Sequence, residues 1–416
     1  MDSLIADPGL AEQGERKIAW AEAWMPVMRH VRDRLRSEGA VDGRRVAVIL
    51  PVEPKTAYLA AALAEAGAQV AVAFQGAMVY DDVAAGLAAR GVSVFARRGS
   101  SREDELGFFE QVLARRPEVV IDDRADVIRL AHTMHPEVLE TLVGASEETT
   151  SGVVALRAME AEGTLRVPCI AANDARCKYL FDNRYGSGQS TVSAVMDATN
   201  LLVAGKRFVV VGYGWVGKGI ARRARGMNAQ VVVCEVDPFA ALEAHHDGFE
   251  VLPVREACRE ADIVMTATGV RGSLPPDAIE LLPDGALLAN AGGIDDEFDV
   301  AALREGADEV REARPEVEEL VFGEGRSLFV VGGGVVVNLS AGEGHPVEIM
   351  DLTFAVQALS ARYLLEHGGS MRPAVHPLPA EIDEEIARMK LDALGLRIDS
   401  LTETQQEFLR SWEPFA

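Results

Sequence analysis

The stretch that decides the fold is Arg207-Phe-Val-Val-Val-Gly-Tyr-Gly-Trp-Val-Gly217. An apolar run, typical of a buried parallel strand, leads directly into three glycines with the spacing G-x-G-x-x-G. In this pattern Gly212 permits a tight turn, and Gly214 lets the backbone approach a pyrophosphate. Gly217 lets the following helix pack closely on the strand. Trp215 and Val216 open that helix, whose N-terminus attracts phosphate groups, so the stretch predicts a dinucleotide site.

The residue that ends the next apolar run indicates which dinucleotide binds. Glu235 follows Gly217 by 18 residues. A carboxylate at this position accepts hydrogen bonds from a ribose diol and repels a 2′-phosphate, which favours NAD over NADP. Later polar segments at predicted strand ends add Thr268, Gly269 and Asn290 to the cofactor site. The alternative, a glycine turn with only a structural role, does not explain this context.

On both sides of the glycine turn, apolar runs alternate with helical stretches. Strands are predicted over 46–50, 70–74, 92–96, 119–123, 231–234, 263–265, 286–289 and 328–331. This alternation is typical of parallel sheets with crossover helices. Helical spacing of apolar residues predicts one helix over 15–40, and the acidic segment 295–319 is predicted to be a solvated helical face.

Composition restricts the class of protein. The chain has 416 residues, of which 48% are hydrophobic and 25% are charged, and this length suits two domains with a small appendage. A net charge of −24 disfavours binding to nucleic acid or to anionic membranes. No signal peptide or membrane span is predicted, and the cysteines suggest reduced thiols and no metal site, so a cytoplasmic location is expected. These are Cys169, Cys177, Cys234 and Cys258.

Several polar clusters are candidates for chemistry. Lys178 precedes Asp182 by four residues, so the two share one face of a helix. If partly buried, such a lysine can have its pKa lowered enough for proton transfer; the alternative is a surface ion pair. The cluster at 147–152 offers hydroxyls to a ribose or serves as a helix N-cap. His345, between glycines and a proline, is a ligand contact or a structural residue.

These segments, in this order, are similar to the S-adenosyl-L-homocysteine hydrolase family from about residue 44 to the C-terminus. The similarity is carried by SEETTSG at 146–152, ND…K…FDNRYG at 173–186, VAGKRFVVVGYGWVGKG at 203–219, CEVDP at 234–238 and VVNLSAGEGHP at 336–346. The resemblance implies an α/β fold in which a split Rossmann-like substrate domain, 1–183 and 347–375, surrounds an NAD-binding Rossmann domain, 184–346. A small C-terminal dimerisation segment, 376–416, would follow, in a homo-oligomer (dimer or tetramer).

The resemblance also implies a reaction and its residues. In the family, tightly bound NAD oxidises the ribose 3′-hydroxyl of a nucleoside, homocysteine leaves C5′, water adds, and the ketone is reduced again. By position, Lys178 and Asp182 would serve the oxidation, Asp123 would be an acid or base near C4′ and C5′, and Glu148 would hold the ribose. Further substrate contacts are expected from Glu53, Thr56, Asn173, Glu343 and His345, and further NAD contacts from Thr149, Thr150, Ser151, Asn183, Glu235 and Asn338.

The sequence departs from the family pattern at positions expected to face the substrate. Pro51 and Gly293 stand where the family has histidines, and Gln75-Gly76 replaces a Cys-Asn pair. Loss of a positioned acid or base typically slows a reaction by about 10²–10⁴-fold. New charges are expected in the pocket, namely Glu53, Lys55 and Glu343.

These departures predict a diverged member that oxidises C3′ of an adenosine-type nucleoside and then takes another exit, such as epimerisation of the sugar. One alternative is an authentic S-adenosylhomocysteine hydrolase that releases adenosine and homocysteine. The alternative from another class is an inactive NAD-binding regulator. Retention of Lys178, Asp182, Asp123 and Glu148 argues against the regulator.

Overall fold

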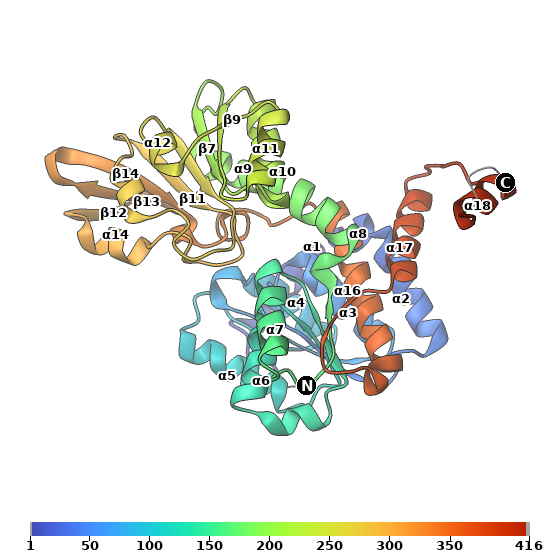
Figure 1. The fold of residues 1–416 in the computed structure, drawn as a ribbon. Coiled ribbons are helices and arrows are strands. Elements are labelled where there is room, and N and C mark those ends of the chain that lie inside the picture. Colours follow the sequence, from blue (N-terminus) through green and yellow to red (C-terminus); the bar gives the residue numbers. More distant parts are fainter. Residues whose placement is uncertain (1, 413–416) are drawn as a thin grey trace.

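The computed structural model describes residues 2–412, which form two lobes joined at two short connections (Figure 1). Each lobe contains one twisted sheet with helices on both faces. The chain crosses from the first lobe to the second through a π-helix, Tyr179–Gly186, and returns just before α16 (Val347–His367). The first lobe is therefore built from both ends of the chain, in the arrangement that the family resemblance implies.

The first lobe holds a seven-stranded parallel sheet with the order β15-β6-β5-β4-β1-β2-β3. Its strands are β1 (Arg45–Val48), β2 (Gln69–Ala73), β3 (Ser93–Phe95), β4 (Val119–Asp122), β5 (Gly144–Glu147), β6 (Cys169–Ala171) and β15 (Val375–Pro377). Nearly every residue of β1 to β6 is buried, as expected for strands covered on both faces. The carboxyl ends of β4 and β5 carry the acidic residues Asp122 and Glu147, which are fully buried.

Helices cover both faces of this sheet. They are α1 (Ala11–Trp24), α2 (Pro26–Glu38), α3 (Pro54–Glu65), α4 (Asp81–Ala89), α5 (Arg102–Leu113), α6 (Asp126–Thr133), α7 (Thr150–Ala161), the short α8 (Arg176–Lys178), α16 and α17 (Ala380–Ala393). The long α16 is buried along most of its length and packs on α2, α3 and the sheet. It thereby carries side chains from the end of the chain to the carboxyl ends of β4 and β5.

The second lobe holds an eight-stranded mixed sheet with the order β12-β13-β14-β11-β10-β7-β8-β9. Its strands are β7 (Arg207–Val211), β8 (Gln230–Cys234), β9 (Glu250–Val251), β10 (Ile263–Thr266), β11 (Ala286–Asn290), β12 (Glu309–Arg314), β13 (Val317–Phe322) and β14 (Arg326–Val331). Its helices are α9 (Ser187–Thr199), α10 (Trp215–Gly226), α11 (Pro238–His246), α12 (Val254–Cys258), α13 (Pro276–Ile279), α14 (Val300–Gly306) and α15 (Val337–Ser340). The glycine stretch thus joins β7 to α10 at the centre of this sheet.

Two predicted elements were wrong. The acidic segment predicted as helical contains one short helix, α14, but from Glu309 onward it enters an antiparallel hairpin, β12 and β13, which extends the sheet beyond β14. Its outer strand is fully exposed and charged, a composition that protects a free sheet edge and that hides the strand signal in the sequence. The predicted helix 15–40 is two helices, because Pro26 cannot donate to the preceding turn and restricts Met25.

The C-terminal segment does not begin as a separate unit at residue 376. β15 pairs with β6, and the Asp383 carboxylate of α17 accepts hydrogen bonds from the backbone N–H groups of Arg176 and Cys177 at 2.7 and 2.9 Å. Only the stretch with α18 (Glu403–Arg410) projects away from the first lobe (Figure 1). The predicted boundary was therefore placed too early, because docking of β15 and α17 depends on distant partners.

A buried ion pair fastens α17 to the first lobe. The Lys390 ammonium lies 2.9 Å from the Asp351 carboxylate, which is fully buried. We expect Lys390→Met to lower the free energy of unfolding by about 3 kcal/mol, because it leaves a buried charge without its partner. Arg388→Met on the same helix breaks an exposed pair and should change it by less than about 1 kcal/mol. Urea denaturation measures both, and equal effects would contradict the prediction.

Candidate active site

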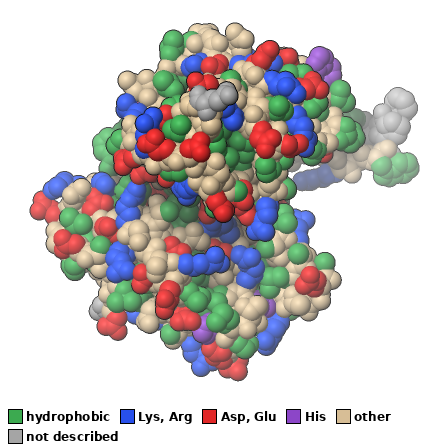
Figure 2. Space-filling model, turned by 90° about the vertical axis from the view of Figure 1, so that its left-hand side faces the viewer, with side chains coloured by type: hydrophobic (Ala, Val, Ile, Leu, Met, Phe, Trp, Pro, Cys, Tyr) green, Lys and Arg blue, Asp and Glu red, His purple; other side chains and the backbone are tan. Residues whose placement is uncertain are grey.

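A cavity of about 620 Å³ lies where the carboxyl ends of the two sheets face each other. The first lobe lines it with Asp123, Glu148 and Lys178, and the second lobe lines it with Gly214 and Thr268. Figure 2 shows the molecule hollowed between the two lobes. Parallel sheets bind ligands at this edge, so the cavity is the candidate active site. In the part of the chain that the structure describes, no cluster of His, Cys, Asp and Glu suits a metal ion.

The glycine turn has the geometry that a dinucleotide needs. Gly212 has a φ of +98°, a left-handed conformation that favours glycine. A Cβ at Gly217 would lie 1.9 Å from the Gly212 carbonyl oxygen, so only glycine lets α10 start so close to β7. A Cβ at Gly214 would meet open space, and this residue lines the cavity with Trp215 and Val216 at the N-terminus of α10. The turn therefore fits a pyrophosphate.

Glu235 and Asn338, two predicted cofactor residues, have different surroundings. Glu235 accepts hydrogen bonds from the backbone N–H groups of Tyr213 and Val236, both at 2.6 Å, next to the glycine turn. Asn338 lines the cavity, and its buried Oδ1 has no hydrogen-bond partner among the described residues, so this oxygen is free to accept one from a ligand amide.

Asn290 was predicted to contact the cofactor directly, but the structure places it behind the cavity wall. It is fully buried and is not among the described residues that line the cavity. Its side-chain amide donates to the carbonyls of Ile294 and Gly334, and its oxygen accepts from the Gly292 N–H. Asn290 thus shapes the loop that carries Gly293. Thr268 and Gly269, in contrast, do line the cavity.

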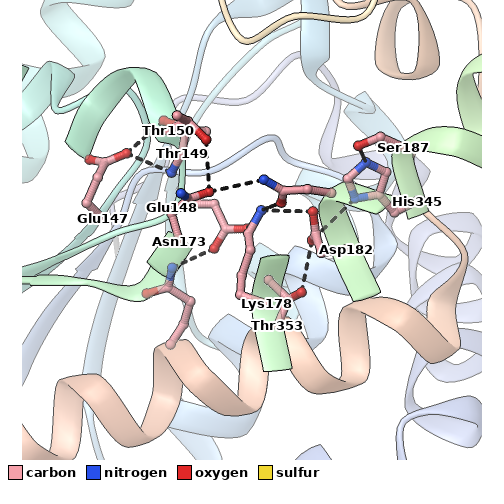
Figure 3. A network of polar contacts seen from close by, with 12 residues as sticks. Glu147, Glu148, Thr149, Thr150, Asn173, Lys178, Asp182, Ser187, His345 and Thr353 are labelled. Carbon is pink, nitrogen blue, oxygen red and sulfur yellow. Dashed lines mark hydrogen bonds and ion pairs between the residues drawn. The ribbon is translucent and has the colours of Figure 1, made fainter. Parts of the chain in front are cut away.

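The centre of the site is a buried lysine surrounded by acceptors (Figure 3). The Lys178 ammonium lies 2.8 Å from both Asp182 Oδ1 and Asn183 Oδ1, and 3.3 Å from Glu148 Oε1. The π-helix is wider than an α-helix because its hydrogen bonds join residues five apart, so both positions i+4 and i+5 can approach the Lys178 side chain. Lys178 is 5% and Asp182 is 1% exposed, which excludes a surface ion pair.

The charges of this cluster oppose the predicted lowering of the lysine pKa. Burial lowers the pKa of Lys178, but the carboxylates of Asp182 and Glu148 outweigh burial and raise the pKa above its usual value. Burial likewise raises the pKa of Asp182, but the positive charges of Lys178 and His345 outweigh it, and the net shift is strongly downward. The pair is therefore an ammonium and a carboxylate at neutral pH, and Lys178 donates hydrogen bonds in this state.

Glu148 is the group of the cluster that titrates near neutrality. Burial raises its pKa to about 7, against the opposing charge of Lys178. Its second oxygen accepts a hydrogen bond at 2.5 Å from the Gln357 amide of α16. Ser146 in turn donates to Gln357 Oε1. A carboxyl group with this pKa can exchange a proton with a ligand hydroxyl.

A second group of carboxyls ends β4 and β5. Burial raises the pKa of Asp123, which lines the cavity and whose Oδ1 is buried without a hydrogen-bond partner among the described residues. Burial also raises the pKa of Asp122 to about 8, and the pKa of Glu147 lies well above its usual value for the same reason. Asp122 and Glu147 accept backbone hydrogen bonds, whereas Asp123 faces the ligand space.

The hydroxyl groups of residues 149–151 serve both predicted roles, one as a helix N-cap and the others as candidate ligand contacts. Thr149 is the N-cap of α7, and its hydroxyl accepts from the Gly152 N–H at 3.3 Å. Thr150 and Ser151 line the cavity beside it. Thr150 donates to the side-chain oxygen of Asn173 at 3.2 Å, and the same oxygen accepts from Asn183 at 3.3 Å. Asn173 therefore links α7 to the π-helix.

Two of the three charges predicted for the pocket, Glu53 and Lys55, form an ion pair with each other. The Lys55 ammonium lies 2.6 Å from Glu53, whose carboxylate also caps α3 through the Thr56 N–H. Lys55 also donates to the backbone carbonyl of Glu343 at 2.7 Å. Glu53 and Thr56 line the cavity, whereas the Glu343 side chain is exposed and is not among the described residues that line it, so the structure does not support its predicted substrate contact.

His345 lies at the return connection between the lobes. Its Nδ1 is 3.3 Å from Asp182 Oδ2, and its Nε2 is 3.0 Å from the Ser187 hydroxyl. Thr353 of α16 donates to the same Asp182 oxygen at 2.9 Å. His345 thus connects the hinge to the lysine cluster. Pro51 and Gly293, at the positions where the resemblance implies histidines, also line the cavity, and neither offers a group that transfers protons.

The sequence did not reveal four residues of the site. Gln357 and Thr353 come from α16, and nothing in the chain near them indicates which strands they face. Glu297 is fully buried and accepts from the N–H and hydroxyl of Thr268, which shapes a cavity-lining loop. Arg124 lines the cavity directly after Asp123; its position next to a predicted strand end was a usable signal.

Comparison with known proteins agrees with this architecture. Residues 2–135 match the family model described as S-adenosyl-L-homocysteine hydrolase, and residues 183–344 match the model for the NAD-binding domain of that family. NAD is therefore the cofactor of the second lobe.

Full-length relatives are numerous. An adenosylhomocysteinase of Pyrococcus abyssi is 48% identical over 99% of this chain and 98% of its own length. An adenosylhomocysteinase of Thermotoga maritima is 49% identical over 96% of this chain and 99% of its own length. An S-inosyl-L-homocysteine hydrolase of Methanopyrus kandleri is 46% identical over 98% and 97%. With these relatives, two matched domains and the cavity between them, the chain belongs to the S-adenosyl-L-homocysteine hydrolase family.

Proposed function

We propose that this chain hydrolyses a nucleoside thioether of homocysteine after oxidation of the ribose. The observation that carries the proposal is the buried cluster of Lys178, Asp182 and Glu148, in a cavity shared with the glycine turn of the NAD domain. The reaction breaks the C5′–S bond, the thiol leaves, and the oxygen of water takes its place at C5′. Relatives named for this reaction span nearly the whole chain.

The second lobe would hold the cofactor. The turn from Gly212 to Gly217 and the N-terminus of α10 would bind the pyrophosphate, and Thr268 and Gly269 would lie along the dinucleotide. Asn338, with its free oxygen, would bind an amide of the cofactor. NAD, when bound, supplies the oxidant for the sugar hydroxyl.

The lysine cluster would act on the ribose 3′-hydroxyl. The Lys178 ammonium, held by Asp182, donates a hydrogen bond to the hydroxyl oxygen and stabilises negative charge that develops there. Glu148 accepts the hydroxyl proton, because its pKa of about 7 lets it hold and release a proton near neutrality. Asp123 would remove the proton at C4′ and return it after water has added, because its raised pKa and free oxygen suit both steps.

The relatives support hydrolysis better than the epimerisation predicted from the sequence. Epimerisation stays the second candidate, since one observation favours it. Pro51 and Gly293 line the cavity where histidines are expected from the family, so fewer groups there can protonate a leaving thiolate.

Product analysis distinguishes the two candidates. The protein, loaded with NAD, is incubated with S-adenosylhomocysteine or with S-inosylhomocysteine, because relatives are named for each. Hydrolysis predicts stoichiometric release of thiol together with free nucleoside. Sugar inversion without thiol, detected by NMR, would replace hydrolysis by epimerisation. Neither product, with no reduction of the bound cofactor, would identify a regulator.

Activity should depend on Glu148 ionisation. Because the pKa of Glu148 is raised to about 7, its carboxylate, the form that accepts the hydroxyl proton, is lost as the pH falls through that value. We expect kcat/KM to fall by about tenfold per pH unit below this point. Glu148→Gln should be slower and should lack this arm of the profile, whereas Glu162→Gln, on the exposed end of α7, should keep it. If the Glu148→Gln variant shows the same fall in kcat/KM at low pH, the ionisation belongs to another group.

A further inference from the structure

Arg124 stands out among the residues that line the cavity. It follows Asp123 directly, at the end of β4, and its side chain is 14% exposed. Both Arg124 and Ala125 adopt left-handed backbone conformations, with φ of +58° and +54°. Residues with a side chain are strained in this region, so two in succession require support from the surrounding structure.

The strained turn is held by buried acceptors. Glu147 Oε1 accepts from the Arg124 N–H at 3.0 Å, and Glu147 Oε2 accepts from the Ala125 N–H at 2.9 Å. The Thr149 hydroxyl also accepts from the Arg124 N–H, at 3.0 Å. Glu147 itself is fully buried. These contacts fix the direction in which the Arg124 side chain leaves the backbone.

The guanidinium group at the end of this side chain is not satisfied by the protein. Its Nε and Nη2 atoms are buried and have no hydrogen-bond partner among the described residues. The carboxylates of Asp126 and Asp295 approach only to 3.6 Å, and the Phe74 ring centre lies 5.9 Å away. A guanidinium offers five N–H donors in a planar fork, and buried donors without acceptors are energetically costly. The geometry suits a ligand that supplies the missing acceptors.

We infer that Arg124 binds an anionic group, a carboxylate or a phosphate, on the 5′ substituent of the nucleoside. Both groups match the guanidinium fork with two parallel hydrogen bonds. The 5′ side follows from the neighbouring Asp123, which the proposed function assigns to C4′, and the inference rests on the proposed function in this respect. Arg124 is therefore a specificity-determining residue of this cavity.

The surrounding charges favour the carboxylate of an amino acid over a phosphate. Asp126 and Asp295 flank the guanidinium, and they attract an ammonium group as strongly as they repel a second negative charge. An α-amino acid presents a carboxylate to Arg124 and an ammonium to these two residues at once. A phosphate offers only the first of these contacts.

The test measures binding and not turnover. Two isosteres of S-adenosylhomocysteine, in which a methylene group replaces sulfur so that no thiol can leave, differ only in the α-carboxylate. We expect the NAD-loaded protein to bind the carboxylate form about 10- to 100-fold more tightly than the decarboxylated form. In Arg124→Gly, which also relieves the left-handed strain, this ratio should fall to about 1. Ala125 has the same left-handed backbone conformation as Arg124 but carries no charge, so Ala125→Gly should leave the ratio of affinities unchanged.

The outcomes separate the ligand classes and the two proposals. The inference is overturned if neither the α-carboxylate nor a 5′-phosphate increases affinity in a way that Arg124→Gly abolishes. Adenosine 5′-phosphate is measured against adenosine as a third arm. If the phosphate increases affinity more than the carboxylate does, and the increase depends on Arg124, phosphate is identified as the anion. A smaller increase in affinity identifies the carboxylate. Because no arm requires thiol release, failure of hydrolysis leaves this result intact.

Discussion

Lys178→Met is expected to reduce turnover by about 10²–10⁴-fold, the effect typical of removing a positioned group that transfers or stabilises a proton. The ammonium lies within 2.8 Å of Asp182 and Asn183, so the substitution removes the donor on which the cluster converges. The bound ribose hydroxyl then faces two carboxylates with no positive charge between them. Oxidation of the sugar, the proposed first step, should therefore be lost along with hydrolysis.

A single-turnover experiment checks this prediction. Nucleoside is added to NAD-loaded protein, and the absorbance of the reduced nicotinamide is followed. Lys178→Arg keeps the positive charge and tests whether loss of charge alone explains the defect. Because Lys178→Met leaves carboxylates buried without their partner, its NAD content and unfolding transition are measured first. Normal reduction of the cofactor in a folded Lys178→Met protein would exclude Lys178 from the oxidation.

Gly217→Ala is expected to weaken NAD binding by about 10- to 100-fold or more, the range set by the cost of overpacking a close contact. The added Cβ would lie 1.9 Å from the Gly212 carbonyl oxygen, and a backbone atom cannot move aside as a side chain does. The N-terminus of α10 must shift away from β7, and it takes the pyrophosphate site with it.

The same helix supplies the control for this substitution. Gly226→Ala, at the last residue of α10, places its Cβ in open space. It should leave NAD binding unchanged and stabilise the protein slightly, because alanine loses less backbone entropy than glycine on folding. NAD titration by calorimetry on cofactor-free protein compares the two variants. Equal affinities would show that the turn tolerates a side chain at Gly217.

Local patterns were sufficient for much of the structure. The apolar runs before and after Gly212 predicted the buried parallel strands of both lobes, because strands covered on both faces contain few polar residues. The edge hairpin β12–β13 escaped prediction, since its outer strand is exposed throughout and four of its six residues are charged. The first part of the C-terminal segment was misassigned for a related reason: β15 and α17 are fixed by contacts with residues far away in the sequence.

By itself, the sequence determined the alternation of strands and helices, the NAD turn from Gly212 to Gly217 and the spacing that pairs Lys178 with Asp182, because each depends on residues close together in the chain. The tertiary structure alone decided the charge state of that pair, because burial lowers the pKa of Lys178 while the approach of Asp182 and Glu148 raises it by more. It also decided that Asn290 supports a loop and that Arg124 points into the cavity with unused donors. Burial and electrostatic interactions depend on every neighbour in space, and spacing along a sequence does not record them.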